Sequence, residues 1–203
     1  MISSELTEQL RCLAKKQGVS LFVILLAIYK ALLCRYTNQS DIIVGTPMLG
    51  RAEKRFESAI GYFINMINIR SVIDGNQSFS KYLEQLKRTV AYGLDNAAYP
   101  FHTLVSQLEL KSSAIHSPVF QTIFVLQNFL SILAQKEFAA KYPNISIMQN
   151  LNQEGDFDLS MEMIEGEKEL SIHLSYNDDL FNENRIIGFV EHYIKLAQEI
   201  VLN

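Results

Sequence analysis

The sequence has little of what marks an exported protein or a nucleic-acid binder. Its 203 residues carry a formal net charge of −4, and no run of lysine or arginine is longer than two residues, as at Lys15-Lys16. Such a chain has no basic surface for a phosphate backbone, so we expect no nucleic-acid partner. Residues 1–8 are polar and begin like a helix, unlike a secretory signal. We therefore expect a cytoplasmic location.

Long apolar runs and clustered cysteines are also missing. The apolar run Leu21–Tyr29 is interrupted by Lys30 and Arg35, far short of the roughly 20 residues of a membrane-spanning helix. This stretch predicts a buried core helix and no membrane partner. Cys12 and Cys34 have no close-spaced partner, which argues against a disulfide framework or a zinc site. We expect both cysteines to pack within the fold.

Periodic segments alternate between helical and strand patterns along the whole chain, with caps at several helix starts. Ser3 or Ser4, Ser20 and Asn182 are candidate N-caps, and Gly18 is placed to end the first helix. The pattern predicts one compact α/β unit over 1–203, of the α+β sandwich type, with a mixed β-sheet packed by helices. The predicted helices are one that begins after Ser3 or Ser4 and ends at Gly18, then 21–36, 78–94, 100–108 and one after Asn182. The predicted strands are 42–44, 63–70, 119–126, 158–164 and 169–176. We expect 46–55 to be a surface loop and 128–153 a partly helical excursion.

Two polar residues stand out in the strand predicted over 63–70. Strand alternation puts Asn65 on the face shared by Phe63, Ile67 and Ile69. An amide there must find hydrogen bonds or lose roughly 1–3 kcal/mol, so Asn65 either bonds neighbouring backbone or serves a function. Arg70, on the opposite face, is either a surface arginine or a partner for a carboxylate across the fold.

Known catalytic fingerprints fail in this sequence. The segment 45–51 has the spacing of a phosphate-binding loop, but Arg51 stands where lysine is required and Pro47 removes an amide donor. We therefore exclude a nucleotide site. His102 and His192 fall in predicted helices, His116 in a loop and His173 on a strand, so solvated or capping roles are expected for all four.

Six segments, in order and spacing, resemble the motifs of condensation domains of nonribosomal peptide synthetases. They are LFVILLAIYKALLCRYTNQSDIIVGTPMLGR (21–51), IGYFINMINIR (60–70), NAAYPF (96–101), SPVFQTIFVLQN (117–128), FDL (157–159) and YNDDLF (176–181). The residues that carry the family's structural motifs are Gly45, Pro47, Gly61, Phe63, Pro100, Phe101 and Pro118. Ala97, Ala98 and His102 depart from the family pattern, which has Gln, Asp and Glu at those positions.

The resemblance implies the C-terminal half of a domain built from two chloramphenicol-acetyltransferase-like halves. The family's His-His-x-x-x-Asp-Gly motif belongs to the other half, so no catalytic residue and no metal is expected in this chain. The implied reaction is an acyl transfer in which the amine of an acceptor aminoacyl thioester attacks a donor thioester. Both substrates would arrive on the 4′-phosphopantetheine arms of carrier proteins, with no cofactor bound directly.

The resemblance implies that the chain forms one wall of the substrate tunnel and is inactive alone. Asn65, Arg70, Gln127 and Asn128 are the candidates for polar groups near the tunnel. A crossing loop near 45–55 and a latch within 128–151 would reach the other half. The implied partners are the N-terminal half of the domain, peptidyl and aminoacyl carrier proteins, and neighbouring synthetase domains.

Two other functions stay open from the sequence. In the first, two copies associate and a surrogate histidine such as His102 or His116 acts as the base. In the second, the chain is a non-catalytic interaction module left by truncation.

Overall fold

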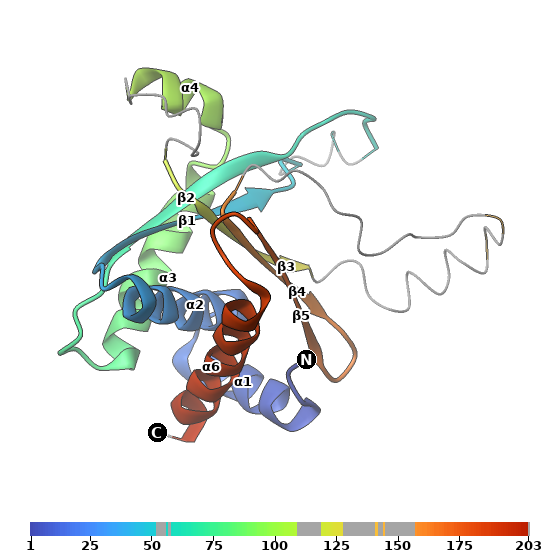
Figure 1. The fold of residues 1–203 in the computed structure, drawn as a ribbon. Coiled ribbons are helices and arrows are strands. Elements are labelled where there is room, and N and C mark those ends of the chain that lie inside the picture. Colours follow the sequence, from blue (N-terminus) through green and yellow to red (C-terminus); the bar gives the residue numbers. More distant parts are fainter. Residues whose placement is uncertain are drawn as a thin grey trace.

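Five strands form one mixed sheet in a computed structural model that describes residues 1–51, 56, 58–108, 119–127, 141, 144 and 157–202. The strand order is β2-β1-β3-β4-β5 (Figure 1). Neighbours β1 and β3, and β3 and β4, are parallel, whereas both outer pairs are antiparallel. The strands are β1 (Asp41–Met48), β2 (Asn65–Val72), β3 (Thr122–Gln127), β4 (Leu159–Glu165) and β5 (Leu170–Tyr176). The predicted fold class is confirmed.

The helices begin where the sequence supplies a cap. They are α1 (Ser4–Gln17), α2 (Leu21–Thr37), α3 (Phe79–Asp95), α4 (Phe101–Gln107) and α6 (Glu183–Leu202). Ser3 accepts a hydrogen bond from the Leu6 amide, Ser20 from the Val23 amide, and Asn182 from the Arg185 amide. These bonds satisfy amides that have no partner inside the helix. Gly18 ends α1 with φ 61°, as predicted.

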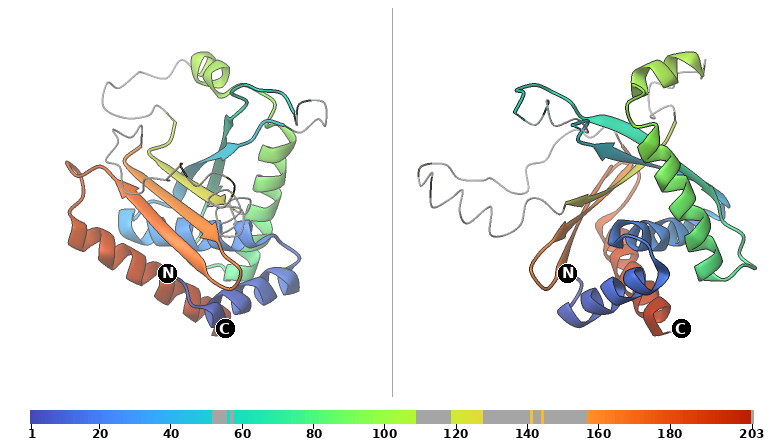
Figure 2. Two further views of the ribbon diagram at one scale, coloured as in Figure 1. Left: turned by 90° about the vertical axis from the view of Figure 1, so that its right-hand side faces the viewer. Right: turned by 180° about the vertical axis from the view of Figure 1, so that it is seen from behind.

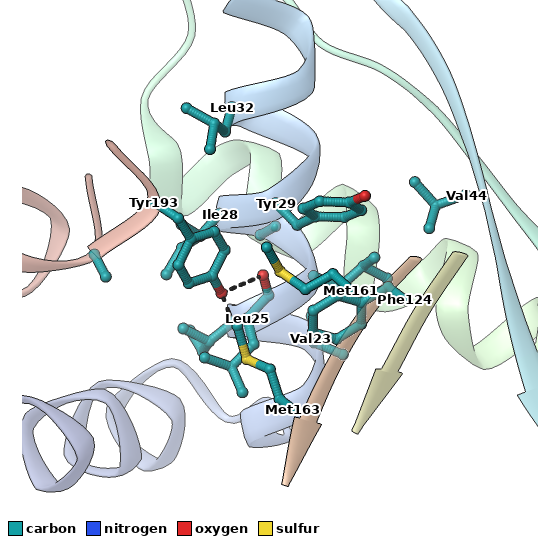
Figure 3. Packing of buried hydrophobic residues seen from close by; sticks show 14 of the residues in the cluster. Val23, Leu25, Ile28, Tyr29, Leu32, Val44, Phe124, Met161, Met163 and Tyr193 are labelled. Atoms are coloured by element: carbon teal, nitrogen blue, oxygen red, sulfur yellow. Dashed lines mark hydrogen bonds between the residues drawn. The ribbon is translucent and has the colours of Figure 1, made fainter. Parts of the chain in front are cut away.

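The core forms between α2 and the sheet. Ten consecutive or nearly consecutive α2 residues between Val23 and Leu33 are buried, as expected for a helix that is apolar on all sides. The Tyr193 hydroxyl of α6 donates to the Leu25 carbonyl oxygen at 3.0 Å (Figure 3). Tyr193 can therefore be fully buried, because a backbone carbonyl of α2 accepts the hydrogen bond that its hydroxyl donates.

The described helices gather on one side of the sheet, except for α4. Helices α1, α2 and α6 lie together on one side, and α3 runs beside β2 and β1 (Figure 2). Helix α4 lies away from that group, at the opposite end of the molecule. The link from α3 to α4 therefore passes the start of β2, where Asn65 lies.

Three predicted strand boundaries and two predictions of burial were wrong. β1 does not end at Val44 but continues to Met48, because it pairs with β2 all the way to the Met48–Asn65 partners. Pro47 is tolerated there because β1 pairs with β3 only at Gly45 and Ile123. β2 begins at Asn65, two residues after Phe63.

β3 is shorter and less covered than predicted. It begins at Thr122, and Phe124 is its one fully buried residue, whereas the sequence suggested burial on both faces. Cys34 packs against the core. Cys12, however, is exposed, because it lies on the outer face of α1, opposite the buried stripe of Leu6, Leu10 and Ala14.

Among the described helices none is long and apolar enough by itself to cross a membrane. Helices α1 and α2 meet that test of length and composition only as a pair, and the chain bends by 104° between them.

Candidate functional site

Asn65 joins two of the motif segments. Its side-chain amide donates to the carbonyl oxygens of Ala97 and Tyr99, each at 2.8 Å, and its oxygen accepts from the Phe101 amide at 3.0 Å. All three partners belong to the segment 96–101. Of the two alternatives that the sequence left open, the structure therefore gives Asn65 the hydrogen bonds to neighbouring backbone.

Gly45 lies beneath an aromatic cluster of Phe101, Phe120 and Phe157. The Phe120 ring lies 5.4 Å from the ring of Phe101 and 5.4 Å from that of Phe157, centroid to centroid. A Cβ at Gly45 would overlap the Phe120 ring. Four motif segments that are far apart in the sequence thus meet at one place on the sheet, and Gly45 must be glycine for the cluster to close.

Arg51, near the beginning of the loop between β1 and β2, contacts residues nearer the end of that loop. Its guanidinium donates to the carbonyl oxygens of Phe56, Ala59 (2.7 Å) and Gly61 (3.3 Å), and it lies 4.2 Å above the Phe63 ring. The Arg51 guanidinium thus binds backbone carbonyl oxygens, whereas the lysine of a phosphate-binding loop binds phosphate oxygens. Gly61 and Phe63, both motif residues, therefore contact Arg51 directly.

Gly50 also has a steric reason to be glycine. It adopts φ +63°, and a Cβ there would overlap the Phe63 carbonyl oxygen. Segment 45–51 is thus the end of a strand followed by a turn into the β1–β2 loop, a geometry unlike the strand-to-helix turn that cradles a nucleotide.

Arg70 forms an ion pair with a carboxylate of the neighbouring strand. Of the two alternatives left open by the sequence, a surface arginine or a partner for a carboxylate, the structure shows the second. The Arg70 guanidinium donates to both oxygens of Asp41, with Nε at 3.0 and 3.2 Å and Nη2 at 2.7 Å. The hydrogen bonds from Arg70 lower the pKa of the Asp41 carboxyl. Both side chains are exposed, so the pair contributes little to stability.

The tunnel candidates do not all lie together. Asn65 opposes Met48, the last residue of β1, whereas Arg70 opposes Ile43 near its start. They lie five residue steps apart along β2, about 16 Å at the usual rise. Gln127, the last residue of β3, donates to the Glu162 carboxylate of β4. Asn128 and Pro118 lie outside the described residues.

The remaining motif residue, Pro100, caps α4. It precedes the helix with φ −65°, and its carbonyl oxygen accepts from the amides of Thr103 and Leu104. Its fixed φ suits this position. Together with the bond from the Phe101 amide to Asn65, it fixes the direction in which α4 leaves the sheet.

An apolar pocket of about 270 Å³ opens at the same edge of the sheet as Asn65. It lies between the start of α2, the end of α3 and the ends of β1 and β3. Its lining residues are Ser20, Phe22, Thr46, Pro47, Met48, Ile67, Val90, Leu94, Val125 and Leu126. A second pocket, of about 340 Å³ between the end of α1 and the start of α3, contains none of the motif residues. Neither pocket was predicted from the sequence.

Lys30 is a buried charged side chain whose backbone partners were not predicted from the sequence. It is fully buried in α2, and its ammonium nitrogen donates to the carbonyl oxygens of Ile42 (2.9 Å) and Ile69 (2.5 Å). Burial lowers its pKa to about 7, although Asp41 acts in the opposite direction. A lysine surrounded on every side of a helix by apolar residues was the available signal.

The described histidines lie on the surface. His102, His173 and His192 are exposed, and the Nδ1 atom of His192 lies 2.7 Å from the Tyr36 hydroxyl. His116 lies outside the described residues. Within the described part of the chain, no group of three or more His, Cys, Asp or Glu side chains could hold a metal ion.

The fold and the motif cluster together define a class of protein. A family model described as "Condensation domain" matches residues 1–203. The chain belongs to the condensation-domain family.

Relatives agree with this membership. The polyketide synthase PksN of Bacillus subtilis (strain 168) is 43% identical over 203 residues, which are 99% of this chain and 4% of that protein. The structure of holo-AB3403, a four-domain nonribosomal peptide synthetase bound to AMP and glycine, matches with a TM-score of 0.87 at 25% identity, covering 100% of this chain and 16% of that one.

A solved condensation domain shows how much of the fold this chain spans. The condensation domain of the monacolin K polyketide synthase MokA matches with a TM-score of 0.81 at 20% identity. The match covers 98% of this chain but 45% of the MokA chain. The chain therefore spans less than half of that condensation domain, and about 4% of the length of PksN.

Proposed function

We propose that this chain is the C-terminal half of a condensation domain and forms one wall of a tunnel for amide-bond formation. One observation carries the proposal: the family match runs from residue 1 to residue 203, yet the chain covers 45% of the MokA condensation domain. The other half of such a domain would then be the N-terminal half, where the resemblance places the paired histidines.

The proposed reaction joins two carrier-bound thioesters. The amine nitrogen of the acceptor attacks the donor's carbonyl carbon, a C–N bond forms, the C–S bond breaks, and the donor's phosphopantetheine thiol leaves. The amine loses a proton to a base, which we assign to the other half because no residue of this chain matches the family's catalytic pattern. Holding both reactants in line supplies much of the rate in such a reaction.

In this proposal the residues of this chain act as a wall. The bonds from Asn65 to the 96–101 segment and the contacts of Arg51 within the β1–β2 loop fix the surface that faces the substrates. Ile60 and Tyr62 are 105% and 86% exposed on that loop, as expected for side chains that another half would cover. Arg70 is a weaker tunnel candidate than Asn65, because it lies toward the far end of β2, opposite Ile43 and away from the segment 96–101.

Reconstitution tests the proposed function. The chain is mixed with the N-terminal half of the PksN condensation domain and with loaded donor and acceptor carriers, and the amide product is measured by mass spectrometry. We expect product from the mixture and none above background from either half alone. A matched control uses an N-terminal half whose second motif histidine is replaced by alanine, which should lose the activity.

Three other results would overturn the proposal. Equal turnover by this chain alone would favour a surrogate histidine, and His102→Ala and His116→Ala would then identify it. Carrier binding without product in any mixture would favour a carrier-binding module that does not catalyse condensation. Neither product nor carrier binding would favour the non-catalytic remnant.

A cytoplasmic location, the carrier proteins as partners and the inactivity of the isolated chain remain predictions. The carrier arms enter as substrates in this proposal.

A further inference from the structure

The pocket beside Asn65 has the composition of a site for an apolar group. Eight of its ten lining residues are apolar, and the other two, Ser20 and Thr46, carry hydroxyls. None of these lining residues, all in the described part of the chain, is charged. The Ser20 hydroxyl already accepts the Val23 amide as the cap of α2. The pocket therefore offers contact area for an apolar group and no partner for a charge.

The position of the pocket is also typical of a ligand site. Three of its residues, Thr46, Pro47 and Met48, are the last residues of β1, and Val125 and Leu126 lie at the end of β3. These two strands are parallel neighbours. Ligands of open α/β sheets bind outside the carboxyl ends of parallel strands. Met48 also opposes Asn65 across the β1–β2 ladder, so the pocket adjoins the surface assigned above to the tunnel wall.

We propose that this pocket receives the apolar side chain or acyl chain of one carrier-bound substrate and selects for it. The inference rests on the proposed function and adds a substrate class to it. At about 270 Å³, the pocket is slightly smaller than the roughly 300 Å³ at which pockets for drug-sized ligands begin. That size suits a single aliphatic or aromatic side chain but not a peptide segment.

Selectivity follows from the lining. A leucyl side chain gains contact with Phe22, Met48 and Leu126, whereas an aspartyl carboxylate would lose its hydration without gaining a hydrogen bond or a charge partner. One methylene in an apolar pocket is worth about 10–200-fold, so we expect leucyl to be preferred over alanyl substrates by at least about tenfold. Discrimination against aspartyl substrates should be larger.

The test fills the pocket and measures substrate preference. Leu94→Trp places an indole at the pocket wall, at a residue that is 45% exposed and so can accept a larger side chain. Leu108→Trp, at a 49% exposed leucine on the surface just after α4, is the matched control outside the pocket. Val125→Phe is the second filling variant if circular dichroism shows that Leu94→Trp does not fold.

Preference is measured in the reconstituted mixture with leucyl, alanyl and aspartyl groups, first on the acceptor carrier and then on the donor. If the preference appears with the acceptor carrier, the acceptor's side chain enters the pocket; if it appears with the donor carrier, the donor's side chain does. We expect the wild type and Leu108→Trp to prefer leucyl over alanyl by at least about tenfold, and Leu94→Trp to lose the preference while it still uses alanyl substrates. An unchanged preference in both filling variants, or no preference in the wild type, would overturn the inference.

A binding measurement separates this inference from the proposed function. Leucyl and aspartyl thioesters of N-acetylcysteamine are titrated into the wild-type chain and into Leu94→Trp, with NMR shifts of the Val90 and Val125 methyl groups as the readout. Shifts with the leucyl thioester only, and only in the wild type, support the pocket even if no mixture forms product. Product formation without such shifts and without preference would leave the proposed function standing and reject the pocket.

Discussion

Gly45 shows how one missing side chain positions several motifs. Without a Cβ at this residue, the Phe120 ring lies directly on the β1 backbone, where Phe101 and Phe157 pack against it. The resemblance identified Gly45 as a structural residue of the family. The structure adds the reason, which is the close approach of an aromatic ring rather than a positive φ.

Gly45→Ala should therefore destabilise the chain. Because the added methyl group would overlap Phe120, we expect the free energy of unfolding to fall by about 1–3 kcal/mol, the usual cost of overpacking. Urea denaturation followed by circular dichroism measures it. Gly75→Ala is the control, since nothing lies within 4 Å of a Cβ there, and it should change stability by less than about 0.5 kcal/mol. Equal losses in the two variants would contradict this account of Gly45.

At the scale of elements, the link between α3 and α4 depends on β2. The three hydrogen bonds of Asn65 attach residues 97, 99 and 101 to the start of that strand. Local sequence signals predicted both helices, because Ser78 and Pro100 lie at their starts. Where the link attaches could not be predicted, since it depends on β2 lying at the edge of the sheet.

Asn65→Ala should loosen this link. Loss of its amide leaves the Phe101 amide and two carbonyl groups without their partner, so we expect a loss of about 1–3 kcal/mol of stability. Hydrogen exchange at the Phe101 amide should also become faster. The matched control is Asn96→Ala, whose exposed amide bonds only the Tyr92 carbonyl of its own helix. Slow exchange at Phe101 in Asn65→Ala would argue that other contacts hold the link.

For the whole molecule, buried ionisable groups determine how stability depends on pH. Lys30 has a pKa of about 7 in the folded chain, against the ordinary 10.5, because burial disfavours its charged form. Between these values the unfolded chain holds one more proton than the folded chain, so stability rises with pH. Burial raises the pKa of Tyr29, Tyr82 and Tyr193 above the ordinary 10.0, so above pH 10 the unfolded chain loses protons first and stability falls.

The free energy of unfolding should therefore increase from pH 7 to a maximum near pH 10. Lys30→Met should remove most of the rise, because it replaces the buried amine with an apolar side chain of similar length. Urea unfolding at intervals across this range measures both curves. Lys81→Met, at an exposed lysine of α3, should keep the wild-type rise. The same rise in Lys30→Met would show that other groups cause it.

The sequence by itself determined the parts of this protein that depend on neighbours along the chain. Caps at Ser3, Ser20 and Asn182, the apolar character of α2 and the alternation in β2, β4 and β5 are short-range patterns, and the structure contains each of them. The order and spacing of the motifs also indicated the family, which the comparisons confirm.

Only the tertiary structure decided which distant residues meet. The contacts of Lys30 with Ile42 and Ile69, the ion pair of Arg70 with Asp41, and the full length of β1 all depend on how β1 and β2 pair. The aromatic cluster on Gly45 and the apolar pocket bring together segments more than fifty residues apart. No periodicity encodes such contacts, because they are fixed by strand order and by the packing of helices across the sheet.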